Sequence, residues 1–166
     1  MTNQTGAPQA SKRKITIERT YQASIEDVWD LWTTRKGIES WWGPEGFTVK
    51  VVEIDLRAGS ELHYTMTATG AAQMDFMKRA RMPLTTEHRA TYTEVIPERR
   101  LAYTLSADFI PDVQPYDVAT LVELHRTAQG VRMVLTFDAM HDEVWTQRAI
   151  MGRESELAKL ANALAA

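Results

Sequence analysis

The sequence of 166 residues contains no cysteine, which excludes disulfide bonds, thiolate catalysis and cysteine-ligated metal sites. It also has no apolar run of the roughly 18 residues that a membrane-spanning helix requires. Lys12, Arg13 and Lys14 are not followed by the apolar segment of a secretory signal. The net charge of -3 provides no basic surface for nucleic acid or for an anionic membrane. These absences predict a cytoplasmic protein that binds neither nucleic acid nor membrane.

Sequence motifs for catalysis and cofactor binding are also missing. The chain has no Gly-x-Ser-x-Gly motif, no phosphate-binding loop and no dinucleotide fingerprint. Its four histidines, at positions 63, 88, 125 and 141, do not have the spacing of helical metal ligands, although neighbouring strands could bring His63 and His88 together. We therefore predict no metal, no cofactor and no catalytic residue. An enzyme is the less favoured interpretation.

The first third of the chain predicts a strand followed by two short helices. Residues 1–13 are polar and small, which is typical of a disordered tail, and residues 14–166 form one predicted domain. Residues 15–21 alternate as a strand does, and Ser24 is a good N-cap for a helix. The helix that follows has one apolar stripe, and a second short helix is predicted over residues 34–42. The stripe consists of Ile25, Val28, Trp29 and Trp32.

The remainder predicts strands in hairpin succession and one long closing helix. Residues 69–84 are Met-rich and irregular, and we predict a loop with some helical turn. Residues 142–165 contain no proline and predict a helix with Asp142 as its N-cap. Together the elements predict an α+β fold in which a curved antiparallel sheet of about seven strands wraps round the long helix. The strands are predicted over residues 47–56, 62–66, 88–96, 101–106, 118–125 and 131–138.

The stretch Trp41-Trp42-Gly43-Pro44-Glu45-Gly46-Phe47 joins the short helices to the sheet. No helix can continue through Gly43-Pro44, because proline lacks an N–H and restricts the residue before it. The paired indoles therefore lie at a corner that could seal the core or form the mouth of a pocket. A structural role is favoured for Trp41. For Trp42 both roles remain open, because adjacent helical residues point apart.

Several of these segments resemble a known family. They are Tyr21-x-Ala23-Ser24-x-x-x-Val28-Trp29, the Trp41–Phe47 corner, Asp55-Leu56-Arg57-x-Gly59, Ile96-Pro97-x-x-Arg100-Leu101-x-Tyr103 and Met151-Gly152. In these segments the chain resembles the AHSA-type family, relatives of the C-terminal domain of the heat-shock-protein-90 ATPase activator. That family belongs to the START-like superfamily, also called SRPBCC or birch-pollen-allergen-like. The resemblance implies a helix-grip fold, often with an apolar cavity between sheet and helix. Arg153 is a departure, because the family usually has an aromatic residue there.

The candidate ligand contacts lie on the predicted inner face of the sheet and on the long helix. This face is both core and pocket wall, so alternation along the strands cannot separate the two roles. Glycine inside a helix costs about 1 kcal/mol, which predicts either close packing or space for a ligand. A solvent-facing Arg153 is favoured; facing inward, it would need Glu53, Asp55, Glu123 or an acidic ligand as partner. The candidates are Trp42, Tyr64, Met66, Tyr92, Tyr103, Leu105, Gly152 and Arg153.

Three functions are compatible with this sequence. The favoured one is binding of a small hydrophobic or amphipathic molecule in a cavity between sheet and helix. The second is a co-chaperone-like interaction module, with a chaperone as partner. The third is a cyclase or dehydratase acting on an aromatic or polyketide-like substrate, which would need polar groups inside the cavity. Residues 73–83 could form a lid whose basic residues steer an anionic ligand, a plain surface loop or a dimer contact, and a homodimer is compatible with all three functions. The groups to inspect for catalysis are Arg153, His63, Tyr64 and Glu123.

Overall fold

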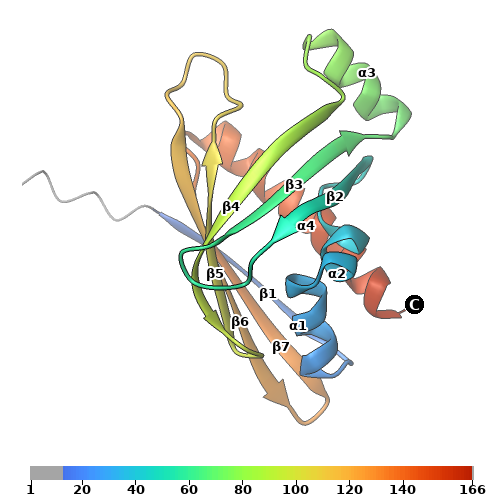
Figure 1. The fold of residues 1–166 in the computed structure, drawn as a ribbon, viewed down its shortest axis with the longest axis vertical. Helices are drawn as coiled ribbons and strands as arrows, with labels where there is room; N and C mark the ends of the chain where they lie inside the picture. Colours follow the sequence, from blue (N-terminus) through green and yellow to red (C-terminus); the bar gives the residue numbers. More distant parts are fainter. Residues whose placement is uncertain (1–12, 166) are drawn as a thin grey trace, which may run out of the picture.

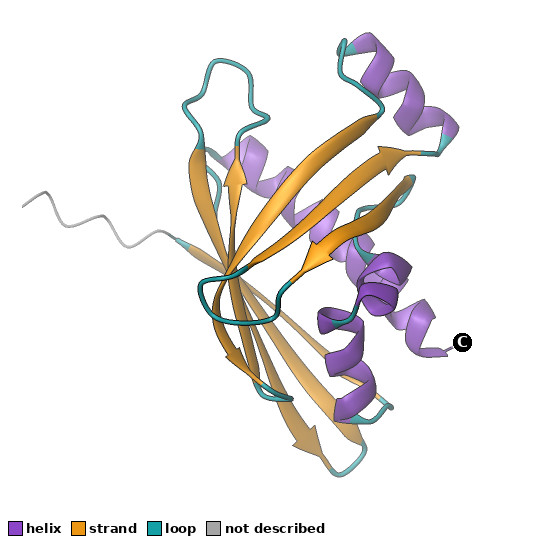
Figure 2. Cartoon of the chain, viewed as in Figure 1, coloured by secondary structure: helices purple, strands orange, loops and turns teal. Residues whose placement is uncertain are grey.

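The computed structural model describes residues 13–165, so nearly all of the predicted tail lies outside the described part. The chain folds into a seven-stranded sheet and four helices (Figures 1 and 2). The elements, in order, are β1 (Lys14–Tyr21), α1 (Ile25–Thr33), α2 (Arg35–Trp41), β2 (Phe47–Ile54), β3 (Glu61–Ala68), α3 (Ala71–Arg79), β4 (Thr85–Ile96), β5 (Arg100–Ala107), β6 (Tyr116–Thr127), β7 (Gly130–Asp138) and α4 (Glu143–Ala165).

The strands form one antiparallel sheet in the order β1-β7-β6-β5-β4-β3-β2. Every strand after β2 pairs with its sequence neighbour, and β1 closes the other edge against β7. The sheet is strongly curved, and α4 crosses it on one side (Figure 1). This arrangement confirms the predicted α+β helix-grip fold. Within residues 13–165 no helix is both long enough and apolar enough to cross a membrane.

The side of the sheet that faces α4 carries the core. Alternate residues of each strand are buried on this side, as a sheet with one covered face requires. The strand register places three aromatic side chains and a threonine in a row across neighbouring strands. Tyr92 pairs with Tyr103, Tyr103 with Thr120, and Thr120 with Phe137. All four are at most 2% exposed, so the row forms the centre of the inner face.

The helices begin at residues whose side chains satisfy free backbone amides. The Ser24 hydroxyl accepts from the Asp27 amide at 3.1 Å, and the Asp142 carboxylate accepts from the Trp145 amide at 2.8 Å. Both predicted N-caps are therefore confirmed. The Thr34 hydroxyl accepts from the Gly37 amide at 3.0 Å, which starts α2 immediately after α1. A Cβ atom on Gly37 would lie 2.2 Å from the Asp30 carbonyl oxygen, so the close approach of the two helices requires glycine there.

The segment between β3 and β4 is more helical than the predicted loop with some helical turn. Residues 71–79 form a complete helix, α3, which projects from the end of β3 and β4 (Figure 1). Good helix formers and an ion pair of 2.7 Å between Asp75 and Arg79, one turn apart, stabilise it. Its Met77 is buried, whereas Phe76 is 64% exposed. The helical pattern was missed because only one position of this short helix contacts the core.

Candidate functional site

A group of polar and aromatic side chains lies between α4 and the inner face of the sheet. Its centre is the guanidinium of Arg153, and we call the group the Arg153 cluster. Two members are charged residues of α4, three carry hydroxyl groups on the sheet, and two are an indole and a phenyl ring. The cluster consists of Trp42, Tyr64, Tyr103, Thr120, Phe137, Arg153 and Glu156.

Arg153 faces the sheet, not the solvent as the sequence favoured. One guanidinium nitrogen donates to the Tyr103 hydroxyl at 3.2 Å and the other to the Thr120 hydroxyl at 2.7 Å. The guanidinium carbon lies 5.0 Å from the centre of the Phe137 ring, within the range of a cation–π contact. A single charged side chain therefore spans three members of the cross-strand row.

The carboxylates that the sequence suggested as partners of Arg153 have other contacts. Asp55 pairs with Arg57 at 2.6 Å, and Glu123 pairs with Arg100 at 3.0 Å. Within residues 13–165, the ion pairs of the structure do not include Arg153. The acidic group that acts on Arg153 is Glu156, one turn further along α4. Burial alone would lower the pKa of Arg153, but Tyr103, Glu156 and Tyr64 more than offset that effect, so its pKa is raised.

Glu156 and Lys159 connect the cluster to the Trp41–Phe47 corner. The Glu156 carboxylate accepts from the Gly43 amide at 3.4 Å, and the Lys159 ammonium donates to the carbonyl oxygens of Gly43 and Phe47 at 2.8 and 3.1 Å. Burial raises the pKa of Glu156, although Arg153, the Gly43 amide and Lys159 act to lower it. Burial also lowers the pKa of Lys159. The corner is thus held by polar side chains of α4.

Aromatic rings form the wall beside Arg153. The ring of Trp42 lies 5.3 Å from that of Tyr64 and 5.7 Å from that of Tyr103, measured between centroids. His88 stacks on Tyr64 at 5.2 Å and shares a hydrogen bond of 2.7 Å with the Thr86 hydroxyl. Burial lowers the pKa of His88 and raises the pKa of Tyr64. Burial therefore favours the neutral form of both groups.

Two buried polar atoms in residues that neighbour Tyr103 have no hydrogen-bond partner among the described residues. They are the indole nitrogen of Trp42 and the hydroxyl of Tyr92, in side chains that are 5% and 1% exposed. An unpaired buried donor costs about 1–3 kcal/mol, so such groups are usually bonded to water or to a ligand. Their position, next to Tyr103 in the aromatic wall, makes this part of the interior able to bind additional polar groups.

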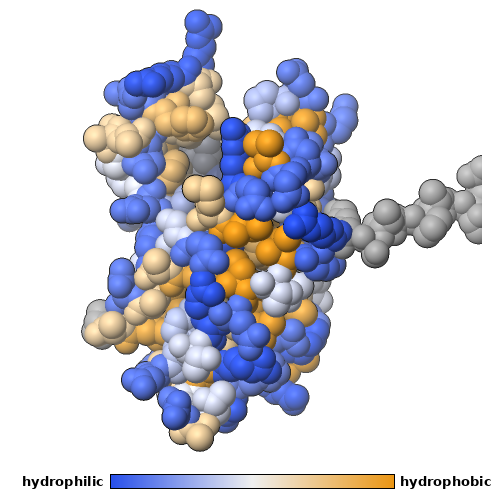
Figure 3. Space-filling model, turned by 180° about the vertical axis from the view of Figure 1, so that it is seen from behind, coloured by the Kyte–Doolittle hydropathy of each residue, from blue (hydrophilic) through white to orange (hydrophobic). Residues whose placement is uncertain are grey.

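Gly152 leaves room beside Arg153. A Cβ atom built on Gly152 would have no heavy atom within 4 Å, so close packing is not the reason for the glycine. Gly152 and Glu156 are one turn apart and share a helix face. Seen from the α4 side, the surface is hollowed between the part that carries α3 and the part formed by residues 108–115 and the start of α4 (Figure 3). Of the two roles that the sequence left open for Gly152, close packing is therefore wrong, and space for a ligand stays a prediction.

The structure brings most of the predicted candidate residues to one region. Tyr64, Tyr92 and Tyr103 are fully buried on the inner face, and Met66 and Leu105 are partly buried around them. The four groups named for catalysis do not converge. His63 bonds Glu87 at 2.8 Å on the opposite side of β3 from Tyr64, and Glu123 bonds Arg100.

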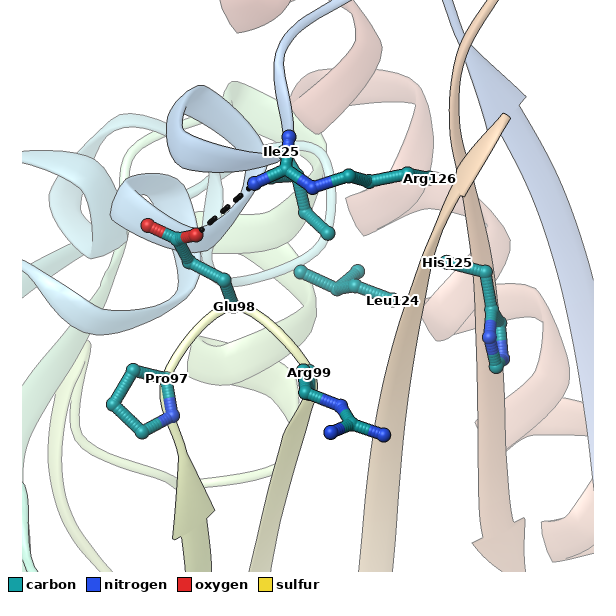
Figure 4. A pocket seen from close by; sticks show the side chains of 7 residues that line it. All are labelled: Ile25, Pro97, Glu98, Arg99, Leu124, His125 and Arg126. Carbon is teal, nitrogen blue, oxygen red and sulfur yellow. Dashed lines mark hydrogen bonds and ion pairs between the residues drawn. The ribbon is translucent and has the colours of Figure 1, made fainter. Parts of the chain in front are cut away.

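Two pockets open at the surface, and neither is lined by the predicted candidates or by the Arg153 cluster. One, of about 440 Å³, lies at the β4–β5 turn near the start of α1 and the end of β6 (Figure 4). There the Glu98 carboxylate faces the Arg126 guanidinium at 3.3 Å, and Arg126 also pairs with Glu26 at 3.0 Å. The other, of about 510 Å³, lies between α1, α2 and the last turns of α4. In the first pocket, the charges of Glu98 and Arg126 are thus paired with each other or with Glu26.

The described residues contain no group of three or more His, Asp or Glu side chains that could hold a metal ion. His63 and His88 do not come together, because His63 pairs with Arg89 in the ladder and points to the outer face, while His88 stacks on Tyr64 at the inner face. The chemistry that the Arg153 cluster offers is a positive charge, unused hydrogen-bond donors and aromatic faces.

Sequence reasoning missed Thr120, Phe137, His88, Glu156 and Lys159 as neighbours of Arg153. A signal existed for the last two, because positions 153, 156 and 159 recur at a spacing of three residues along one helix. Thr120 and Phe137 had no such signal. Their position opposite Tyr103 depends on the strand register, which a single sequence does not specify residue by residue.

The raised pKa of Glu156 predicts a pH dependence of stability. A carboxyl with a folded-state pKa above its unfolded value of about 4.3 adds stability at low pH, and that stability is lost as the pH rises through the folded-state pKa. A Glu156→Gln variant lacks this titration. We therefore expect the unfolding free energy of the wild type, relative to Glu156→Gln, to fall as the pH rises above about 4.3. Urea denaturation across a pH series measures this, with the exposed Glu154→Gln as control; parallel curves for wild type and Glu156→Gln would contradict it.

A curved antiparallel sheet that grips a long C-terminal helix and holds a buried polar cluster defines a helix-grip protein of the START-like class. The family model of the "Activator of Hsp90 ATPase homolog 1-like protein" matches residues 22–165. The chain therefore belongs to this family, which confirms the resemblance seen in the sequence. No curated protein matches the chain.

Solved structures of similar fold come from several bacteria. A protein from Chromobacterium violaceum is 23% identical with a TM-score of 0.74, and the match covers 91% of this chain and 96% of that one. The AHSA1 protein from Silicibacter pomeroyi is 20% identical with a TM-score of 0.70, covering 92% and 98%. An AHSA1-like protein from Aeromonas hydrophila is 20% identical with a TM-score of 0.67, covering 91% and 94%. At these identities the likeness shows the shared fold.

Proposed function

We propose that this protein binds a small hydrophobic or amphipathic molecule between α4 and the inner face of β3, β4 and β5. The observation that carries this proposal is the open space beside Gly152, at the level of a buried cluster with unused hydrogen-bond donors. A helix that only had to cover a core would gain about 1 kcal/mol from alanine at this position. Binding sites of small molecules combine an apolar, largely aromatic lining with a few polar groups, as the Arg153 cluster does.

The proposal predicts opposite effects for two substitutions at Gly152. Gly152→Ala adds a methyl group that meets nothing within 4 Å, so we expect it to raise the unfolding free energy by about 1 kcal/mol and to leave binding intact. Gly152→Phe fills the open space and is expected to abolish binding while the protein stays folded. Native mass spectrometry of the protein purified from its own host detects the bound molecule directly.

The outcomes of this experiment are distinct. A small molecule that co-purifies with the wild type and Gly152→Ala, but not with Gly152→Phe, supports the proposed site. A molecule that remains bound to Gly152→Phe would place the binding site elsewhere. Wild-type protein that carries no molecule, and that binds none of the aromatic probes described below, would overturn the proposal.

A co-chaperone-like function is the second candidate, and the family description together with the exposed Phe76 on the projecting helix α3 favours it. An exposed aromatic on such a helix can serve as an anchor for a protein partner. If this function is correct, the protein should change the ATPase rate of the Hsp90-type chaperone of its host, and Phe76→Ser should remove the effect. An unchanged ATPase rate with the wild-type protein would argue against it.

A further inference from the structure

Among residues 13–165, no carboxylate is hydrogen-bonded to Arg153. Its hydrogen bonds go to two neutral hydroxyls, those of Tyr103 and Thr120. A guanidinium has more N–H donors than these two bonds use, and it is arranged to bind both oxygens of a carboxylate at once. Arg153 is partly buried, and a charge removed from water without an ion-pair partner is costly. Arg153 therefore has both the donors and the electrostatic need for an anion.

The charge balance near Arg153 depends on the protonation of Glu156. Lys159 adds a second cation, and the carboxylates of Glu156 and Glu45 both act on it. Burial raises the pKa of Glu156. His88 and Tyr64 lie on the same side, and burial favours the neutral form of each. Cations therefore outnumber carboxylates in this part of the protein when Glu156 is protonated, which is the form that its burial favours.

The surroundings of Arg153 also restrict the shape and polarity of a partner. The unpartnered nitrogen of Trp42 is a donor, and a donor requires an acceptor oxygen or nitrogen on the ligand. The rings of Trp42, Tyr64 and Tyr103 present aromatic faces and edges, which pack well against a flat apolar group. Gly152 leaves space directly beside the guanidinium-bearing residue.

We propose that the ligand is an amphipathic anion whose carboxylate, or a comparable anionic oxygen group, is bound by Arg153 while its flat apolar part lies against Trp42 and Tyr64. This inference rests on the proposed function, because it concerns the same site, and it adds the chemical class of the ligand. It also explains why an arginine lies at this position. A purely structural role would not require one, because the hydroxyls of Tyr103 and Thr120 could each bond to water.

The test compares two probes of almost identical shape, 2-naphthoate and its neutral analogue 2-naphthamide, by isothermal titration calorimetry at pH 7. We expect the wild type to bind naphthoate at least about tenfold more tightly than naphthamide, the effect of one charge-assisted contact. Arg153→Met should weaken naphthoate binding by about 10- to 100-fold and change naphthamide binding by less than about threefold. Arg148→Met is the matched control, because Arg148 is an exposed arginine of the same helix, stacked on Trp145, and its loss should change neither affinity.

A second variant keeps the test decisive if Arg153→Met does not fold. Glu156→Gln removes the negative charge beside the proposed anion, so it should tighten naphthoate binding by several-fold and leave naphthamide binding unchanged. Equal affinities for the two probes in the wild type would overturn the anionic class and leave the apolar site in place. Binding of neither probe would overturn this inference, and the proposed function would fail with it only if the wild type also carries no co-purifying molecule. An Arg153→Met variant that is less stable but keeps the preference for naphthoate would assign Arg153 to the core alone.

Discussion

A Trp41→Ala variant is expected to lose about 3–5 kcal/mol of unfolding free energy, the usual cost of deleting a buried aromatic side chain. Trp41 is 2% exposed and lies edge-on against Trp32, with ring centroids 4.5 Å apart. Its indole nitrogen donates to the Leu31 carbonyl oxygen at 2.7 Å, which ties the end of α2 back to α1. Removal of the ring therefore leaves a cavity and frees a carbonyl at the junction of the two helices.

The hydrogen bond and the ring can be separated with Trp41→Phe. Phenylalanine fills much of the space but leaves the Leu31 carbonyl unpaired, which costs about 1–3 kcal/mol. Urea denaturation followed by far-UV circular dichroism measures both variants against the wild type. A loss below about 1 kcal/mol for Trp41→Ala would contradict the structural role, because cavity formation alone exceeds that value.

The parts of the fold that follow from local physics could be predicted from the sequence. Alternation placed the strands, and the caps at Ser24 and Asp142 placed the starts of α1 and α4, because each depends on residues within one turn or one strand. The helix α3 was missed for the opposite reason. It projects from the sheet with Met77 as its buried contact, so it has hardly any apolar stripe to reveal it.

The candidate site was predictable as a region but not in its chemistry. The alternating positions of Tyr64, Tyr92 and Tyr103 placed them correctly on the inner face. The direction of Arg153 could not be predicted, because a partly apolar helix admits either orientation and the neutral partners Tyr103 and Thr120 come from distant strands. An ion-pair rule directed attention to carboxylates, whereas the structure bonds the guanidinium to hydroxyls and a ring.

The polar residues of α4 give the Trp41–Phe47 corner its position relative to the cluster. Ser155 accepts from the Glu45 amide at 2.8 Å, and Lys159 donates to carbonyl oxygens on both sides of Gly43-Pro44. Gly43 and Gly46 have φ values of 87° and 88°, which allow the chain to turn tightly there. Because these contacts attach the corner to the helix that carries Arg153, a shift of α4 on ligand binding would also move Trp42.

Substitution of Trp42 is expected to give the second large loss of stability. It also tests whether the Trp41–Phe47 corner only seals the core or contacts a ligand. It is 5% exposed, so Trp42→Ala is expected to cost about 3–5 kcal/mol, as for Trp41. The conservative variants should differ: the Trp42 nitrogen has no protein acceptor among the described residues, so Trp42→Phe should cost less stability than Trp41→Phe.

Ligand affinity should fall more in Trp42→Phe than in Trp41→Phe, the reverse of the order expected for stability. Trp42→Phe reduces the aromatic surface beside Tyr64 and Tyr103 and removes the unpaired indole N–H. We therefore expect about three- to tenfold weaker binding of 2-naphthoate. Trp41→Phe, whose ring packs on Trp32 away from Arg153, should bind the probe as the wild type does. The crossed pattern, with stability lost mainly at Trp41 and affinity lost mainly at Trp42, requires that one indole seals the core while its neighbour contacts the ligand. Wild-type affinity in Trp42→Phe would assign both indoles to the core.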